Sequence, residues 1–367
     1  MNATVCRWGI LGTANIARKN WQGIRRANNC ALTGVASRSL ERSSQFVADC
    51  QAHVPFPAVP RCYGSYEELL RSDDIDAVYI PLPTGIRKPW IIRAAEAGKH
   101  VLVEKPVGVN ADEVREILAA CQRNRVQFMD GVMFMHSGRM RGLRATLDDL
   151  QSVGTIKRIS SEFTFGAGPE FFAENIRTTS DLEPLGCLGD LGWYNIRFTL
   201  WVMGWKLPHR VRAQMLADHQ RPGSPDSVPI DFSAELSFSG GVSATFYCSF
   251  ISQIQQWANI AGAQGSVTLS DFVLPWHGSE LAWEVNQPVF HLRGCDFNME
   301  RHIRRCAVRE YSNSHTDSQE SMMFATFAEL VRSGNPDPFW GQIALDTQRV
   351  TDACLASAHA DGRWIDL

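Results

Sequence analysis

The chain has 367 residues, a formal net charge of −3, and a composition of 44% hydrophobic and 20% charged residues. This length exceeds the size at which one hydrophobic core keeps growing, so we expect two domains, residues 1–130 and residues 131–367. The small negative charge provides no long-range attraction to nucleic acid or to an anionic membrane surface, and we expect neither partner.

The first third of the chain alternates strand-like and helix-like segments. Strands are predicted at residues 7–11, 31–36, 75–81, 100–103 and 127–129, and helices at residues 16–27, 40–49, 66–70, 89–97 and 111–122. Pro89 is expected at the first helical position, where its missing N–H is tolerated, and Gly98 at the end of that helix. This alternation predicts an α/β fold in which a Rossmann-type, doubly wound parallel sheet forms the N-terminal domain.

The turn after the first predicted strand carries an incomplete form of the glycine-rich dinucleotide-binding motif. Gly12 fills the first glycine position, while Ala14 and Ala17 replace the second and third. Small residues at these positions let backbone N–H groups and a helix N-terminus approach a pyrophosphate. We therefore expect the cofactor to contact Gly12, Thr13, Ala14, Asn15 and Ile16, with a plain strand–helix packing turn as the alternative.

The end of the second predicted strand favours NADP, with NAD as the alternative. NAD specificity usually rests on an acidic residue there, which accepts from the ribose 2′-hydroxyl. Here the segment carries Ser37, Arg38 and, one turn later, Arg42. A hydroxyl and guanidinium groups suit a 2′-phosphate, although a solvated helix start would have the same residues.

Two later strands end in segments that cannot continue as strand. One is Pro81-Leu82-Pro83 and the other is Glu104-Lys105-Pro106. Because ligands of open α/β sheets bind beyond the carboxyl ends of the strands, we expect both segments at the cofactor. Lys105 would present a cation to that crevice; the alternative is a solvated turn residue.

After about residue 144 the pattern changes to strands joined by short turns. Strands are predicted at residues 156–165, 231–238, 242–249, 257–261 and 266–269, and helices at residues 189–203, 319–332 and 343–359. This predicts a C-terminal α+β domain with a large, mainly antiparallel sheet. In the helix at 189–203, Asp190 and Tyr194 are four residues apart and share one face.

A lysine, a tyrosine and a carboxylate suit reversible hydride transfer beside a nicotinamide. The cofactor carries the hydride, while the protein supplies a proton and stabilises the developing alkoxide. An ammonium beside Tyr194 would favour the ionised phenol and lower its pKa toward a useful range. The alternative for Tyr194 is a core aromatic residue with a bonded hydroxyl.

Five segments together carry a family resemblance: residues 8–14, 95–101, 104–106, 190–194 and 344–350. They make nearly the whole chain similar to the glucose–fructose oxidoreductase / inositol dehydrogenase (Gfo/Idh/MocA) family. The resemblance implies that Lys105 contacts substrate and nicotinamide, that Tyr194 is the general acid/base, and that Asp190 positions substrate or tyrosine. Arg177 lies on the approach to this helix and is expected to reach cofactor or substrate.

Two positions depart from the family pattern. Arg87 or Lys88 stands where many members carry a histidine, and Asp130-Gly131 replaces a usual Glu-Ala pair. Both changes affect the surroundings of the substrate more than the type of reaction.

These observations predict an NADP(H)-dependent oxidoreductase acting on a hydroxyl or carbonyl carbon of a sugar, polyol or cyclic diol. One alternative is a sugar–sugar oxidoreductase with tightly bound, recycled NADP. The other is a nucleotide-binding regulatory protein without turnover.

The cysteines and histidines indicate the compartment and argue against a metal site. Ten cysteines are scattered without a C-x-x-C pair, and the ten histidines form no tight cluster. We expect free thiols in a reducing, cytoplasmic compartment and no metal. The broad second sheet should leave one face free, so we expect a homodimer or homotetramer formed through it.

Overall fold

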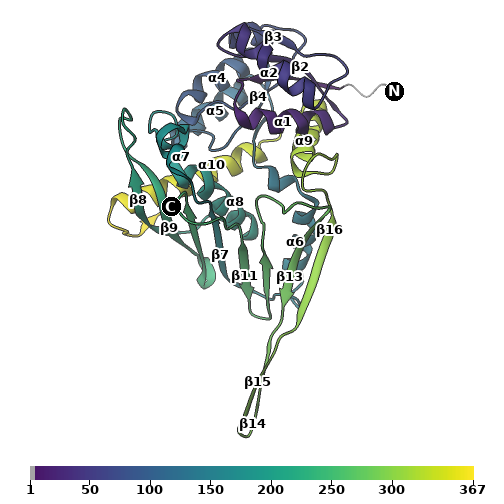
Figure 1. Ribbon diagram of the computed structural model, residues 1–367. Coiled ribbons are helices and arrows are strands. Elements are labelled where there is room, and N and C mark those ends of the chain that lie inside the picture. The colour runs from purple at the N-terminus through teal and green to yellow at the C-terminus, as the bar shows by residue number, and fades with distance from the viewer. Residues whose placement is uncertain (1–4) are drawn as a thin grey trace.

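The computed structural model describes residues 5–367 as two large sheets with helices packed against them, and a separate two-stranded sheet, β14–β15 (Figure 1). The elements of the first sheet are, in chain order, β1 (Cys6–Leu11), α1 (Asn15–Arg26), β2 (Cys30–Ala36), α2 (Leu40–His53), β3 (Arg61–Tyr63), α3 (Tyr66–Leu70), β4 (Ala77–Ile80), α4 (Thr84–Glu96), β5 (His100–Val103), α5 (Ala111–Arg123) and β6 (Phe128–Asp130). Its six strands are parallel, in the order β3-β2-β1-β4-β5-β6. The predicted Rossmann-type sheet is confirmed; the three-residue edge strand β3 was not predicted.

Helix α4 begins at Thr84 and not, as predicted, at Pro89. The N–H and hydroxyl of Thr84 donate to the Glu183 carboxylate, at 3.0 and 2.7 Å. The next N–H, of Gly85, donates to the Leu182 carbonyl at 2.8 Å. Partners from a distant loop therefore satisfy the first turn, and Pro89 lies inside the helix. The prediction was wrong because no local pattern reveals that loop.

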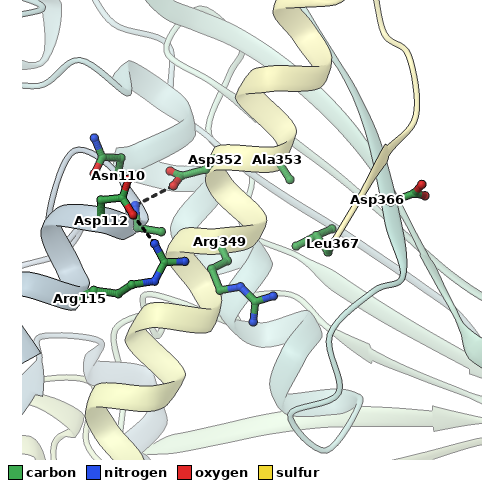
Figure 2. A pocket seen from close by; sticks show the side chains of 9 residues that line it. Asn110, Asp112, Arg115, Arg349, Asp352, Ala353, Asp366 and Leu367 are labelled. Atoms are coloured by element: carbon green, nitrogen blue, oxygen red, sulfur yellow. Dashed lines mark hydrogen bonds and ion pairs between the residues drawn. The ribbon is translucent and has the colours of Figure 1, made fainter.

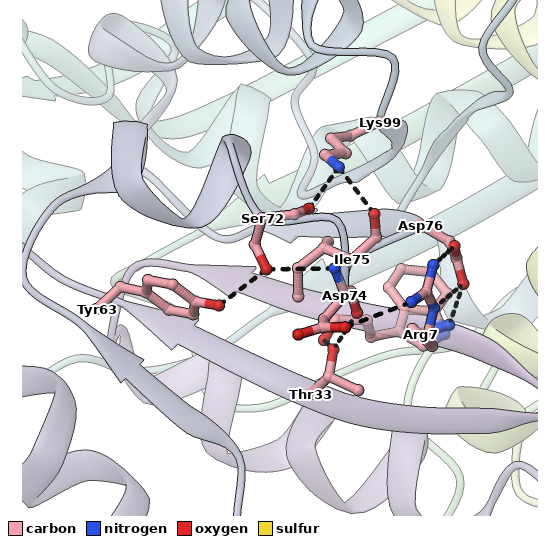
Figure 3. Close-up of polar contacts among 9 residues, drawn as sticks. Arg7, Thr33, Tyr63, Ser72, Asp74, Ile75, Asp76 and Lys99 are labelled. Carbon is pink, nitrogen blue, oxygen red and sulfur yellow. Dashed lines mark hydrogen bonds and ion pairs between the residues drawn. The ribbon is translucent and has the colours of Figure 1, made fainter.

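The edge at which the parallel strands begin is closed by the protein's own polar groups (Figure 3). The Arg7 guanidinium forms a bidentate ion pair with the Asp76 carboxylate, with N–O distances of 3.0 and 2.6 Å. The Lys99 ammonium donates to the carbonyls of Ser72 and Ile75, at 2.8 and 2.9 Å. The charged side chains drawn at this edge therefore have partners within the protein, although a cavity of about 300 Å³, lined in part by Ile75 and Asp76, lies beside them.

The second half of the chain builds a sheet of nine strands in the order β16-β13-β12-β11-β7-β10-β9-β8-β17. Its elements, with those that join the two sheets, are η1 (Met133–His136), α6 (Gly138–Asp148), β7 (Ile156–Thr164), α7 (Pro169–Glu174), η2 (Ile176–Thr178), η3 (Leu188–Gly192), α8 (Trp193–Val202), β8 (Arg210–His219), β9 (Val228–Phe238), η4 (Ser239–Gly241), β10 (Val242–Ser249), β11 (Ala258–Gly262), β12 (Ser266–Leu269), β13 (Glu280–Asn286), β14 (Val289–Arg293), β15 (Asp296–Glu300), β16 (Ile303–Arg309), α9 (Gln319–Ser333), α10 (Phe339–His359) and β17 (Ile365–Asp366).

This second sheet confirms the predicted C-terminal α+β fold. All its strand pairs are antiparallel except β7–β10, which is parallel. Buried and exposed residues alternate along β9 and β13, so helices cover only one face of the sheet. Helices α6 and α7 and strands β8 and β13–β17 were not predicted.

Helix α9 follows the second sheet in the chain but packs on the first. The Trp8 ring on β1 lies 4.9 Å from the Phe324 ring and 5.1 Å from the Phe327 ring. The Lys19 ammonium on α1 lies 2.5 Å from the Glu320 carboxylate. The division of the chain at residue 130 stays a prediction. Within residues 5–367, every helix is too short or too polar to span a membrane.

Candidate active site

The predicted cofactor residues meet at the carboxyl edge of the first sheet. Gly12 ends β1 with φ of +116°, a backbone conformation that favours glycine. A Cβ on this glycine would lie 2.9 Å from Leu82 Cδ2, in the segment that follows β4. The glycine turn and the Pro81–Pro83 segment are therefore neighbours, as expected for strand ends at the same edge.

The start of α1 offers free backbone donors to an anion. Ala14 is the N-cap residue and makes no side-chain capping bond, and no acidic residue stands in the first turn. Asn15 and Ile16 are exposed there. Uncapped N–H groups and the positive end of the helix dipole fit a pyrophosphate.

Ser37 and two arginines gather where β2 ends. The Ser37 hydroxyl is buried and lies 3.3 Å from the Thr13 hydroxyl, while Arg38 and Arg42 are exposed. Tyr66, which sequence reasoning missed, lies beside them: burial raises the pKa of its phenol, and the charges of Arg38 and Arg42 partly oppose that shift. These groups fit a phosphate on an adenosine ribose, because a hydroxyl and two cations follow the end of β2, with Glu41 in the first turn of α2 as the nearest carboxylate in sequence.

Lys105, Asp190 and Arg177 form one ion-pair cluster. The Lys105 ammonium donates to the Asp190 carboxylate at 2.8 Å and to its backbone carbonyl at 2.5 Å. The Arg177 guanidinium contacts the other carboxylate oxygen at 2.8 Å. Burial raises the pKa of Asp190, but the Arg177 and Lys105 charges outweigh it and hold this pKa well below its usual range. Two cations thus share one carboxylate.

Asp190 and Tyr194 reach Lys105 from one helical segment. Asp190 lies in the π-helical turn η3, which runs directly into α8, where Tyr194 is the second residue. The Lys105 ammonium lies 4.7 Å from the centre of the Tyr194 ring, over its face. The predicted sharing of one face is therefore confirmed.

The expected lowering of the Tyr194 pKa is wrong. Tyr194 is only 7% exposed, and this burial, with the Glu104 and Asp190 charges, raises its pKa well above the usual value. Lys105 faces the ring, while the hydroxyl donates to Met133 Sδ at 3.6 Å. The phenol is therefore held neutral, beside a weak acceptor.

A buried hydrogen-bond network supports the residue that precedes Lys105. Glu104 Oε1 accepts from the Tyr79 hydroxyl at 2.6 Å and from the Asn20 amide at 3.2 Å, and Asn20 also donates to the Tyr79 hydroxyl at 2.6 Å. Glu104 thereby anchors the end of β5 to β4 and α1. Its predicted contact with the cofactor stays a prediction.

Arg87 joins two of the segments at this edge. Its side chain is 2% exposed and donates to the Leu82 carbonyl at 2.7 Å and to the carbonyls of Glu104 and Pro106. The arginine that departs from the family pattern thus ties the end of β4 to the end of β5. Sequence reasoning flagged its charge but could not identify these backbone partners.

A separate hollow lies between the start of α5 and helix α10 (Figure 2). Its polar groups largely satisfy one another: Asp352 accepts from the Ala111 N–H at 2.7 Å, and Arg115 pairs with Asp112. None of the predicted site residues lines it. Across residues 5–367 there is also no group of three or more His, Cys, Asp or Glu side chains that could hold a metal ion.

Two family models match the chain in succession. The model described as "Oxidoreductase family, NAD-binding Rossmann fold" matches residues 6–132. The model of the "GFO/IDH/MocA C-terminal domain" matches residues 141–268. Together they cover the first sheet, the strands of the second sheet up to β12, and the candidate site.

Named relatives are similar over most of the chain. A trans-1,2-dihydrobenzene-1,2-diol dehydrogenase from Bos taurus is 28% identical over 345 residues, covering 89% of this chain and 96% of the relative. A D-xylose 1-dehydrogenase (NADP(+)) from Haloferax volcanii is 32% identical over 259 residues, covering 70% and 74%. A 3-ketoreductase from Actinomadura kijaniata, solved with NADP and TDP-benzene, superposes with a TM-score of 0.77 at 24% identity, covering 96% and 98%. This last likeness concerns the fold.

Proposed function

This chain belongs to the GFO/IDH/MocA family of NAD(P)-dependent oxidoreductases, and we propose that it transfers hydride between NADP and a hydroxyl or carbonyl carbon of a sugar, polyol or cyclic diol. The predicted family, enzyme class and nicotinamide cofactor are confirmed at this level. The particular substrate, the preference for NADP over NAD and the residue roles are proposals.

The observation that carries the proposed chemistry is the Lys105–Asp190–Arg177 cluster against the face of Tyr194. It lies at the sheet edge where the cofactor residues meet. Two cations face one carboxylate in this cluster, although the Glu104 and Glu183 charges also reach Tyr194 and Arg177. The Lys105 ammonium, as a hydrogen-bond donor, would stabilise a substrate oxygen as it becomes an alkoxide.

We assign the following roles. When bound, the nicotinamide supplies or accepts the hydride. Lys105 donates a hydrogen bond to the reacting oxygen, and Asp190 fixes the position of its ammonium. Tyr194, held as a neutral phenol, gives its proton to that oxygen when a carbonyl is reduced and takes it back from the hydroxyl in the reverse direction. The raised pKa keeps this phenol in the protonated form that carbonyl reduction requires, and it also makes the phenol a weaker acid than an exposed tyrosine.

The groups at the end of β2 support the preference for NADP. Ser37, Arg38 and Arg42 would hold the 2′-phosphate, and Tyr66 would contact the same end of the nucleotide. Changing Arg38→Glu should weaken NADPH binding by about 10–100-fold and weaken NADH binding little, because the carboxylate repels a phosphate but accepts from a hydroxyl. Fluorescence titration with both nucleotides measures this without requiring a substrate. Equal affinity of the wild-type chain for NADPH and NADH would contradict the assignment.

The substrate class is best tested with a panel of pentoses, hexoses, inositols and cyclic diols. The relatives named for dihydrobenzene-diol and xylose oxidation support this range. Activity is followed by the absorbance of reduced cofactor, with NADP and NAD in parallel. Turnover of two sugars without added nucleotide would favour the alternative of tightly bound, recycled NADP.

The remaining alternative is a nucleotide-binding regulatory protein. It predicts no turnover with any member of the panel and a biological effect that survives Lys105→Met. Cytoplasmic location, the division at residue 130 and a homo-oligomer formed through the second sheet also stay predictions.

A further inference from the structure

A two-stranded hairpin, β14–β15, extends away from the rest of the molecule (Figure 1). It continues the β13–β16 pair without interruption: Asn286 lies opposite Ile303, and Val289 lies opposite Glu300. The same number of residues separates these pairs on both strands, so no bulge shifts the register. Seven further residues on each strand, at about 3.3 Å per residue, carry the hairpin roughly 23 Å beyond the sheet.

The two faces of this hairpin differ in chemistry. Directly opposed residues share a face, so the pairs Phe290–Met299 and Leu292–Phe297 lie on the same side. These four side chains are 55%, 71%, 57% and 68% exposed, respectively, and form the apolar face of the hairpin. The other face is mostly polar: Val289, His291, Arg293, Asp296, Asn298 and Glu300.

The apolar face lies on the uncovered side of the nine-stranded sheet. In β13 the core-facing residues are Leu281, Trp283 and Val285, so even-numbered residues face outward. The unbroken register carries this alternation into Phe290 and Leu292. Ile303, 40% exposed, extends the apolar row back to the sheet.

The exposed apolar area is large for an element without a partner. With roughly 150–250 Å² for a large aromatic side chain, these exposures leave about 500 Å² of apolar surface on one hairpin. That equals the largest patch of a typical monomer, and such patches usually mark an interaction site. If two identical faces covered each other, they would bury about 1,000 Å², the lower limit for a specific interface.

We propose that the hairpin, residues 288–301, is an arm that packs its apolar face against a second copy of this chain. Two-fold association brings the same patch of both copies together, so one apolar row supplies both sides of the contact. A membrane fits less well, because Arg293 and Arg301 are balanced by Asp296 and Glu300 and give no attraction to anionic lipid. The inference does not depend on the proposed reaction.

The test measures the mass of the full-length chain in solution by light scattering over a dilution series. The wild type should be a dimer or a multiple of it. The double variant Phe297→Ser/Met299→Ser should dissociate at a concentration at least about 30-fold higher, because it removes two apolar contacts from each arm. The matched control, His291→Ser/Asn298→Ser, changes an opposed pair on the polar face and should leave the mass unchanged.

A second variant shows whether a loss of mass in the first variant comes from loss of the arm or from misfolding. Replacing residues 288–301 by Asn-Gly closes β13 and β16 with a two-residue turn and removes the whole arm. It should show the same loss of mass with an unchanged circular dichroism spectrum. A monomeric wild type, a dimer that survives in both arm variants, equal loss in the polar-face control, or sedimentation of the wild type with phosphatidylcholine–phosphatidylserine vesicles would each overturn the proposal.

Discussion

Two carboxylates, the partly buried Asp190 and the fully buried Asp130, are held by cations in different ways. Asp190 is shared by Lys105 and Arg177, each at 2.8 Å, and the Arg177 side chain is 38% exposed. Asp130, at the end of β6, has one partner, Arg197, at 3.2 and 2.7 Å, and both side chains are 0% exposed. The third nitrogen of Arg197 donates to the Thr347 hydroxyl at 2.8 Å.

The difference separates a site that can accept a ligand from one that only joins elements. The Asp130–Arg197 pair is electrically balanced, and its hydrogen bonds are used within the protein. A second cation is avoided there: burial, and then the Arg197 charge, lower the pKa of the neighbouring His136 to about 3. Around Asp190 a second cation is present and partly open to solvent, so the cluster can attract a developing negative charge.

The largest expected effect is on activity, in Lys105→Met. Loss of the ammonium should lower kcat by about 10³-fold, because it removes the main positive group proposed to contact the reacting oxygen. The fold should persist, since Asp190 keeps Arg177 as a partner. Steady-state kinetics with the best substrate of the panel, and a thermal melt, measure both effects. The control is Lys88→Met, which breaks a surface ion pair with Glu116. A kcat of Lys105→Met within tenfold of the wild-type value would contradict the proposed role.

The next effect is on stability, in Arg197→Met. This change leaves the Asp130 carboxylate buried and unpaired, so the free energy of unfolding should fall by about 3–5 kcal/mol. Denaturant titration measures the loss. The double variant Asp130→Leu/Arg197→Met should regain most of it, because no uncompensated charge remains. If the double variant is no more stable than the single one, packing and not charge explains the loss.

The parts of the site that lie at strand ends or on one helix face could be predicted from the sequence. Strand β5 and the proline after Lys105 are local signals, and the spacing of Asp190 and Tyr194 needs only helix geometry. The direction of the Tyr194 pKa shift could not be predicted. It depends on how deeply the side chain is buried and on whether the ammonium lies over the face of the ring or beside its hydroxyl oxygen.

Groups whose partners lie far along the chain were missed for the same physical reason. Arg87 binds backbone carbonyls, and Thr84 is capped by Glu183, and neither partner leaves a local pattern. The hairpin arm was missed although its apolar residues alternate with polar ones, which is the pattern of a strand; its position beyond the core leaves no local signal. Sequence reasoning therefore located the residues at strand ends and on one helix face, but not the distant contacts that hold them in position.

A smaller effect concerns pH, through His136 beside the balanced pair. Its folded pKa of about 3 lies below the usual value near 6.5, so the unfolded chain takes up the proton first as pH falls. Stability should therefore drop as pH falls from about 6.5 toward 3, by roughly 1–2 kcal/mol between pH 6.5 and pH 4.5 after allowance for partial exposure of the ring. In His136→Phe, which keeps the stacking on Trp340, this part of the acid sensitivity should vanish. An unchanged pH dependence of denaturant midpoints would show that other groups cause it.

The smallest expected effect is that of Arg177→Met, which removes the second cation beside Asp190. Arg177→Met leaves the Lys105–Asp190 contact in place, so catalysis should continue, with kcat/KM lowered about tenfold because the cluster loses one positive charge. Because the Arg177 side chain is partly exposed, the free energy of unfolding should change by less than about 1 kcal/mol, unlike that of Arg197→Met. Arg212→Met, which breaks an exposed pair with Glu235, serves as the control. A loss of stability as large as that of Arg197→Met, with unchanged kcat/KM, would mean that Arg177 is a structural partner and that the two carboxylates do not differ in function.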